Sequence, residues 1–292
     1  MSVGIIEGLA EATAAFVKVF SGAINDWIGR RKPLLLLGYV AGLGSGLGIN
    51  TGHELGHRRE QLEQWLARLV LAVPGYGHFT VEHGRGHHRQ VATPEDSASA
   101  RMGESIYRFA LREIPGGLAR AFALEGESLR RDGRRFFSPH NTILQSYAGT
   151  AALHAALIAA FGAVMLPFLL VHDLAAWWQL TSANYVEHYG LLRARLPDGS
   201  FEPPRPHHSW NANHLVTNLV LFHLQRHSDH HANAGRRYQS LRAHPDAPQL
   251  PSGYFGMFPV AYLPPLWFRV MDKRLLALPH VRGDLSRVHR TP

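Results

Sequence analysis

Cysteine is absent from this chain of 292 residues. Its absence excludes disulfides, thiolate-bound zinc, iron–sulfur clusters and a fused rubredoxin-like electron carrier, because each of these needs cysteine ligands. Any one-electron chemistry must therefore use metal bound by histidine, or take its electrons from a separate protein.

Charge is absent from two long stretches. Residues 143–172 contain no Asp, Glu, Lys or Arg, and the run LAAWWQLTSANYV after Asp173 is again uncharged. A membrane span needs about 20 apolar residues. The region therefore predicts two helices that cross or nearly cross a bilayer, with a break near Pro167 or Asp173. The alternative is a buried hairpin of a soluble helical bundle, where such long uncharged stretches are uncommon.

Three further segments have apolar character. Residues 33–52 predict another span, since their small residues suit close helix packing in lipid and the basic residues 30–32 match a cytoplasmic boundary. Residues 65–79 include an arginine and a proline and predict a half-buried helix. Residues 1–29 carry four charges and predict an amphipathic interfacial helix rather than a signal peptide.

Acidic residues are fewer than basic ones, 22 against 30, which gives a formal charge of +8 and a pI of about 10.1. Such a balance suits nucleic acid, anionic lipid or an acidic protein as partner. The arginines are expected in loops and lack the aromatic interleaving of a single-strand binding groove. We therefore predict cytoplasmic loops of a membrane protein and no nucleic-acid partner. The arginines concerned are Arg108, Arg112, Arg120, Arg130, Arg131, Arg134 and Arg135.

Histidine, by contrast, is abundant, with 20 residues. HELGH fits the HExxH pattern of a zinc metalloprotease, in which His53 and His57 lie one helical turn apart and Glu54 activates a metal-bound water. Three more motifs follow in EHGRGHH, NYVEHYG and LQRHSDHH. Their histidines are His83, His87, His88, His188, His227, His230 and His231.

The spacing of these histidines indicates shared metal. Offsets of three and four residues bring side chains to one helical face. A zinc protease needs only three protein ligands, whereas nine imidazoles suffice for two metals with four or five nitrogens and an open position each. Imidazole suits iron, zinc and copper alike, so the ligand type alone leaves the metal open.

Carboxylates accompany every histidine motif. A metal-bound histidine usually donates its other ring N–H to a carboxylate or carbonyl, which fixes its tautomer and orientation. We therefore predict supporting roles for nearby acids, the alternative being simple surface charge. The candidates are Glu54, Glu82, Glu187 and Asp229 beside the motifs, with Glu95 and Asp96 shortly after the second.

The other histidines suggest plainer roles. His78 and His223 are expected to pack near the ligands or support them, and His154 and His172 to mark interfaces in the apolar hairpin. The rest are predicted to lie in loops or at the surface, namely His140, His207, His208, His214, His244, His280 and His289.

The ordered motifs resemble those of the integral-membrane alkane 1-monooxygenases. The matching strings are NTGHELGH, GHFTVEHGRGHHRQVATPEDSASARMGES, NYVEHYGLLR, HSWN, LQRHSDHHA and PPLWFRVMD, from residue 50 to about 272. The resemblance implies an all-α integral-membrane helical bundle with a histidine-rich di-iron site on the cytoplasmic side of the bacterial inner membrane. The implied ligands of the two non-haem irons are His53, His57, His83, His87, His88, His188, His227, His230 and His231.

The resemblance also implies a reaction and partners. One oxygen atom of O2 would enter the terminal C–H bond of a medium-chain n-alkane, with electrons from rubredoxin and its NADH-dependent reductase. Because an unactivated methyl group offers side chains nothing to act on, such a reaction needs a metal cofactor. Basic loops would favour docking of an acidic rubredoxin.

Relative to the family, we expect a form shortened at its N-terminus. Family members usually have six transmembrane helices, whereas 52 residues precede His53 here and three or four spans are recognisable. We predict one membrane domain over residues 1–292, with an atypical segment 1–32, a family-like region 33–272 and a tail 273–292. A homo-oligomer is one way to complete the walls of a substrate channel.

Three alternatives stay open from the sequence. A related hydroxylase or desaturase would act on alkyl-aromatic or fatty acyl substrates on the same scaffold. An intramembrane zinc metalloprotease would use HELGH alone. A non-catalytic protein would bind metal without turnover.

Overall fold

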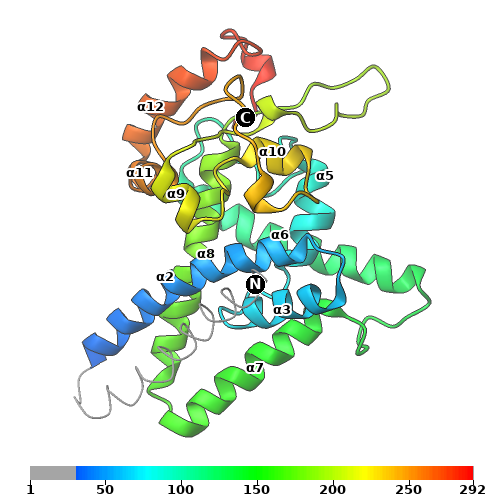
Figure 1. Ribbon diagram of the computed structural model, residues 1–292, viewed down its shortest axis with the longest axis vertical. Coiled ribbons are helices and arrows are strands. Elements are labelled where there is room, and N and C mark those ends of the chain that lie inside the picture. The colour runs from blue at the N-terminus through cyan, green and yellow to red at the C-terminus, as the bar shows by residue number, and fades with distance from the viewer. Residues whose placement is uncertain (1–30, 292) are drawn as a thin grey trace. The chain divides into compact units, whose positions relative to one another are not determined.

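The computed structural model describes residues 31–291, and all regular elements in that range are helices (Figure 1). The predicted all-α class is confirmed. The amphipathic helix expected in residues 1–29 lies outside the described residues. The chain forms two compact units, one of residues up to Val81 with Ala121–Leu180, the other of Glu82–Arg120 with Thr181 onward. The single-domain prediction stays a prediction.

The first unit is built on long apolar helices. It contains α2 (Arg31–Gly56), α3 (Gln61–Ala72), α4 (Phe79–Val81), α7 (Thr142–Phe161) and the first part of α8 (Met165–His188). Helix α3 packs against α2 and α7. A methyl group added at Gly42 would collide with the backbone of His172, so α2 and α8 approach each other closely, as small residues permit.

The break in the apolar hairpin lies shortly before Pro167. Helix α7 starts at the cap Asn141, whose side chain accepts a hydrogen bond from the Leu144 amide. It ends at Gly162, which has a φ of 79°. The predicted break near Pro167 is therefore confirmed to within a few residues, and Pro167 itself stands in the first turn of α8, where its missing N–H costs no hydrogen bond. The alternative position, Asp173, lies inside α8.

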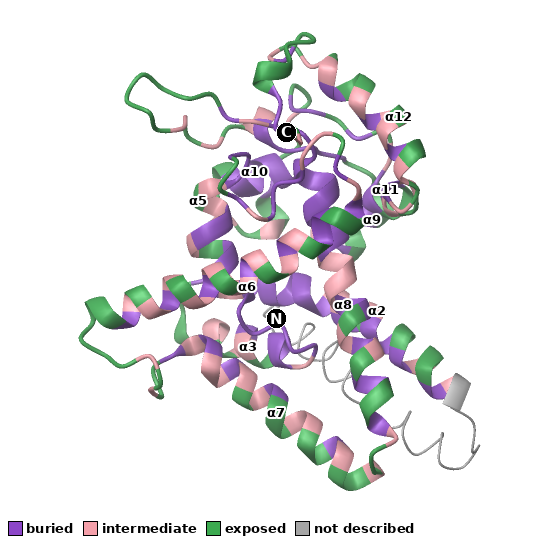
Figure 2. Cartoon of the chain, turned by 180° about the vertical axis from the view of Figure 1, so that it is seen from behind, coloured by how far each residue is buried: buried purple, intermediate pink, exposed green. Residues whose placement is uncertain are grey.

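Two of the described helices are long and apolar enough to cross a membrane, Pro33–Gly56 and Thr142–Phe161. Exposed and half-buried residues run along α7 in Figure 2, as expected where lipid rather than protein covers a helix. Helix α8, predicted as another span, is not among the two. Polar residues such as Asp173, Gln179 and Asn184 lower its hydropathy.

The second unit consists mainly of short helices joined by long ordered loops. Helix α12 (Pro264–Leu276) buries one face, which carries Trp267, Met271 and Leu275 at intervals of four residues. The other elements are the π-helix η1 (Glu82–His87), α5 (His88–Gln90), α6 (Ile106–Arg131, of which residues from 121 belong to the first unit), η2 (Pro206–His208), α9 (Leu215–Val220), α10 (His227–Ala232), η3 (Tyr238–Ser240), α11 (Tyr254–Ala261) and η4 (Leu285–Arg287).

Five of the arginines expected in loops lie on a helix instead. Helix α6 carries Arg108, Arg112, Arg120, Arg130 and Arg131. The loop prediction rested on the arginines alone. It overlooked the hydrophobic residues of this segment, which recur at helical spacing.

Candidate metal centre

A π-helical turn carries the motif EHGRGHH. The turn covers Glu82–His87 and passes into α5 at His88. A π-helix pairs residues five apart rather than four. His83 and His88 therefore face each other, with their Nε2 atoms 3.0 Å apart. The offset of four residues predicts that His83 and His87 share one metal, and this is wrong, because His87 belongs to a different group.

The first histidine group comprises His83, His88 and His230 of the second unit. Helix α10 supplies His230, whose Nε2 atom lies 3.0 Å from that of His88. The candidate ligand nitrogens of the group lie within 4.8 Å of one another. Residues separated by 142 positions in the sequence thus offer nitrogens to one point.

The second histidine group comprises His87, His188, His227 and His231, all buried. The Nε2 atom of His227 lies 3.1 Å from that of His188 and 2.9 Å from that of His231. The ring of His87 lies 4.8 Å from that of His188 and 4.9 Å from that of His231, measured between centroids. Helix α10, which carries His227 and His231, is coloured mostly as buried in Figure 2.

The donor atoms of these groups fit a metal ion. A neutral imidazole has one N–H and one lone pair, so several Nε2 atoms that converge cannot all be satisfied by bonds to one another. The buried Nε2 atom of His87 has no hydrogen-bond partner in the described part of the chain. Burial, followed by neighbouring imidazoles, holds the pKa of His231 well below its usual value and keeps it in the neutral form that binds metal.

Asp96 fixes the orientation of His87. The Nδ1 atom of His87 lies 2.9 Å from a carboxylate oxygen of Asp96, to which Ser99 also donates at 2.7 Å. Arg120 donates to the other oxygen at 2.8 Å and pairs with Glu82. Burial alone would raise the pKa of Asp96, but the charge and hydrogen bond of His87, with Arg120, hold it well below its usual range.

Sequence reasoning missed Arg120, which joins two of the predicted supporting acids. It stands 24 residues after Asp96, on a helix without any histidine motif. The sequence offered one general indication of such a residue: two acids that are buried together need a cationic side chain nearby.

Two other predicted supporting acids have partners of a different kind. Glu54 pairs with Arg58 one turn later on the chain. Asp229 pairs with Arg236 at 2.5 Å and lies 3.2 Å from His244. These contacts fix the loop after α10, so Asp229 supports the backbone that carries His230 and His231.

Glu187 lies on the ligand side of the second histidine group. Its Oε2 atom is 3.2 Å from the Nε2 atom of His227, and both side chains are 2% exposed. Its carboxyl group also forms a hydrogen bond with the hydroxyl group of Tyr254, which is buried too.

The HELGH motif ends α2 in the first unit. His53 and His57 lie one turn apart, as predicted, with their Nε2 atoms 3.3 Å apart. His53 is buried and packs its ring 6.1 Å from that of Phe79.

His78 and His223 have packing partners, as expected. The Nδ1 atom of His78 lies 2.9 Å from the hydroxyl of Tyr147, and the two rings stack. His223 contacts the carbonyl of Tyr238 at 3.0 Å.

His172 and His154 mark an interface, as predicted for the apolar hairpin. His172 lies 2.8 Å from the hydroxyl of Ser45 on α2 and 2.6 Å from Asp173. His154 of α7 lies 3.6 Å from the other oxygen of Asp173. The network links α2, α7 and α8 within the first unit.

Two histidines predicted to lie in loops or at the surface, His208 and His289, are buried, although His289 does lie in a loop. His208 and its neighbour His207 form a third cluster with Glu202. The Nδ1 atom of His208 accepts the backbone N–H of Arg205 at 2.9 Å, so Nε2 carries the proton and points towards Glu202, 3.3 Å away. The Nδ1 atom of His208 is therefore already used by the backbone of η2, and its Nε2 atom faces Glu202.

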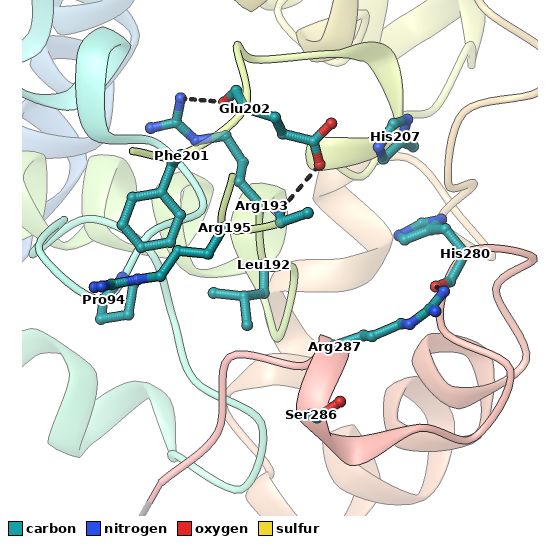
Figure 3. Close-up of a pocket in the computed structure, with 11 residues that line it drawn as sticks. Pro94, Leu192, Arg193, Arg195, Phe201, Glu202, His207, His280, Ser286 and Arg287 are labelled. Carbon is teal, nitrogen blue, oxygen red and sulfur yellow. Dashed lines mark hydrogen bonds between the residues drawn. The ribbon is translucent and has the colours of Figure 1, made fainter. Parts of the chain in front are cut away.

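A basic cavity of about 600 Å³ adjoins this pair (Figure 3). The guanidinium group of Arg193 donates to the backbone carbonyl of Glu202 at 2.9 Å. Glu202 is the only acid in the lining, which otherwise consists of Pro94, Leu192, Arg193, Ala194, Arg195, Phe201, His207, His280, Ser286 and Arg287.

Comparison with known proteins agrees with the histidine pattern. The fatty acid desaturase family matches residues 32–261. Alkane 1-monooxygenase 1 of Alcanivorax borkumensis is 54% identical over 92% of this chain and 67% of its own length. Alkane 1-monooxygenase of Ectopseudomonas oleovorans is 54% identical over 90% of this chain and 66% of its own.

A more distant relative has a different name. The xylene/toluene monooxygenase hydroxylase component of Pseudomonas putida is 31% identical over 93% of this chain and 71% of its own length. The chain thus spans about two thirds of the length of the relatives that it matches.

Proposed function

Because this chain belongs to the fatty acid desaturase family, and within it to the alkane 1-monooxygenases, we propose that it hydroxylates the terminal methyl group of medium-chain n-alkanes. The balanced reaction consumes the alkane, O2, two electrons and two protons, and yields the primary alcohol and water. The buried convergence of ligand nitrogens in the second histidine group is the observation that carries this proposal.

The proposed cofactor is a pair of non-haem iron ions held by the nine histidines of the four motifs, His53 and His57 included. Bound iron would supply the activation of O2 that attack on an unactivated C–H bond requires. Imidazole is a suitable ligand for iron, and burial holds the pKa of His231 well below its usual value, which keeps this ring neutral. Asp96 keeps the proton of His87 on Nδ1 and leaves Nε2 for the metal.

Residues around the ligands keep water away from the reacting atoms. His87, His188, His227 and His231 are all less than 10% exposed. Exclusion of water strengthens electrostatic interactions in the site and prevents side reactions. Both effects suit the hydroxylation of an unactivated C–H bond.

The electron donor in this proposal is rubredoxin, reduced by its NADH-dependent reductase. The basic cavity lined by Arg193, Arg195 and Arg287 gives an acidic protein a complementary surface (Figure 3). Residues 1–292 contain no cysteine, so they cannot themselves hold the cysteine-bound iron of such a donor.

We further propose a multi-pass protein of the bacterial inner membrane, with the histidine site towards the cytoplasm. Family membership and the two apolar helices α2 and α7 support this location. Extraction of membranes at alkaline pH tests it: the protein is expected to stay in the pellet, and release into the supernatant would contradict the proposal.

A second candidate function is hydroxylation of a methyl group on an aromatic ring. The 31% identity to the xylene/toluene monooxygenase component favours it over the fatty acyl and protease alternatives. The higher identity to alkane 1-monooxygenases makes the alkane the leading substrate.

The reaction is tested in membranes supplied with rubredoxin, reductase, NADH and O2. We expect 1-octanol from octane, measured by gas chromatography, and none from the variant His231→Ala. Xylene in a parallel assay separates the two substrate classes. A longer alkane 1-monooxygenase controls the electron supply, and failure of this chain where that control succeeds would contradict the proposal.

A further inference from the structure

Helix α9 of the second unit has a reversed amphipathic pattern. Its two polar residues, Thr217 and Asn218, are 4% and 5% exposed, and Asn218 donates a hydrogen bond to the side chain of Asn213 at 2.8 Å. Its four aliphatic residues are all exposed, with Leu215 at 73% and Leu219 at 67%. A helix on a water-facing surface normally buries its apolar residues and exposes its polar ones. The outer side of α9 therefore suits an apolar surrounding rather than water.

Helix α11 and the start of α12 extend this apolar surface. Residues 247–268 contain no charged residue and no histidine. A methyl group added at Gly253, the N-cap of α11, would collide with the side chain of Thr217, so α11 begins directly against α9. Helix α11 also packs against α12, and the three helices lie side by side in Figures 1 and 2. The exposed residues of this surface, which we call the outer apolar face, are Leu215, Val216, Leu219, Val220, Phe255 and Leu263.

Basic side chains border the outer apolar face on α12. Leu266 is exposed near the start of this helix, and Arg269 and Lys273 follow it as exposed residues at offsets of three and four. Residues at these offsets share one side of a helix. The outward side of α12 thus changes from apolar to basic along its length. A membrane surface has the matching order, with anionic headgroups above apolar acyl chains.

We propose that the outer apolar face lies in the lipid interface of the membrane, with its side chains among the acyl chains and the basic end of α12 at anionic headgroups. This inference rests on the proposed membrane location and adds a contact besides α2 and α7. Helices α9 and α11 have six and eight residues, whereas a membrane span needs about 20, so they lie on the bilayer and do not cross it. The second unit then has a lipid contact of its own.

The experiment uses the lack of cysteine, because one introduced cysteine then carries the only thiol label. Leu219→Cys and Phe255→Cys of the full chain are labelled with bimane and reconstituted in vesicles of phosphatidylcholine and phosphatidylglycerol. Nitroxides on the lipid acyl chains quench a label that touches lipid, whereas iodide quenches a label in water. We expect both labels to resist iodide, to be quenched by the nitroxides, and to lie about 5–10 Å below the headgroup boundary.

Leu196→Cys is the matched control, since Leu196 is another exposed leucine of the second unit but lies in a loop beside the charged residues Arg195 and Asp198. Its label should be quenched by iodide and not by the lipid nitroxides. Ala155→Cys, at an exposed position of α7, reports on the membrane location itself and should be quenched by the nitroxides.

Iodide quenching at Leu219 and Phe255, together with nitroxide quenching at Ala155, would overturn the inference and leave the membrane location intact. Shielding of both labels from iodide and from the nitroxides would mean that a protein surface, such as a second copy of the chain, covers this face, and would also overturn the inference. Absence of nitroxide quenching at Ala155 as well as on the outer apolar face would overturn both proposals.

Discussion

At the residue scale, the site depends on which nitrogen of each histidine is protonated. The sequence offers acids beside every motif, yet only some of them contact a ligand ring. Asp96 does so, nine residues after His87, because the turn between them folds back and Ser99 and Arg120 hold the carboxylate. Glu54 and Asp229 were predicted to support ligands just as Asp96 does, because they too lie beside a motif. In the structure, however, both pair with arginines.

Asp96→Asn should weaken iron binding and activity. The amide cannot accept the His87 proton with the strength of a carboxylate, and it leaves Arg120 without one of its two acids. We expect the affinity for iron, measured by chelator competition, to fall about 10- to 100-fold. The neighbouring change Glu95→Gln affects an exposed residue and should leave affinity unaltered. Equal affinities for the two variants would refute this role of Asp96.

Glu113→Gln should stabilise the protein at alkaline pH. Burial raises the pKa of Glu113 to about 7, against an ordinary 4.5, so the folded state binds the proton more tightly than the unfolded state. Stability from this group is therefore present below pH 4.5 and is lost as pH rises through about 7. The neutral amide does not suffer this loss.

The difference between wild type and Glu113→Gln should grow between about pH 5 and 7 and reach on the order of 3 kcal/mol above that range. Thermal unfolding in detergent across this range measures it. The amide still accepts from one of Thr181 and Asn184, which limits any loss at low pH. A difference independent of pH would contradict the assigned titration.

At the element scale, the π-helical turn η1 decides how the second motif divides. In an ordinary α-helix His83 and His88 would point in different directions, because residues three and four apart share a face. The π-helical turn brings them together and sends His87 to the other group. Spacing in the sequence cannot reveal this division unless the helix type is known.

Deletion of Gly84 should remove the extra residue of this turn and separate His83 from His88. We expect iron content, measured by mass spectrometry of the purified protein, to fall from about two per chain to about one or fewer. Gly84→Ala is the control, since a methyl group there meets no atom within 4 Å and the φ angle is ordinary. Retention of both irons in the deletion variant would show that the π-helical register is not required.

At the scale of the whole molecule, charge determines which partners approach. The chain has a formal charge of +8, and the second unit concentrates arginines around one cavity. Long-range attraction of this kind mainly raises association rates and falls with ionic strength. The predicted loop location is wrong for five arginines, although the basic surface itself remains.

The double variant Arg195→Glu and Arg287→Glu should slow association with an acidic rubredoxin. We expect the association rate at low salt to fall about tenfold, and its dependence on ionic strength to weaken. Stopped-flow electron transfer from reduced rubredoxin measures both. Exposed Arg134 and Arg135 of the first unit provide a control with the same change in charge. An equal effect of the two double variants would mean that net charge, rather than this cavity, guides the donor.

The sequence by itself determined the helical class, the histidine motifs and the family they resemble. These follow from residue types at short spacing, which local helical geometry converts into shared faces. It also predicted the two apolar helices and a break near Pro167, whereas the end of α7 at Gly162 depends on that residue's positive φ.

Only the tertiary structure decided which side chains meet. His88 joins His230 across 142 residues, Arg120 reaches Asp96 from another helix, and Glu187 faces the ligand side of His227. Such contacts depend on the packing of distant elements and on the π-helical register, neither of which spacing along the chain encodes. The sequence therefore identifies the histidines that can bind metal, whereas the fold determines which side chains each of them contacts.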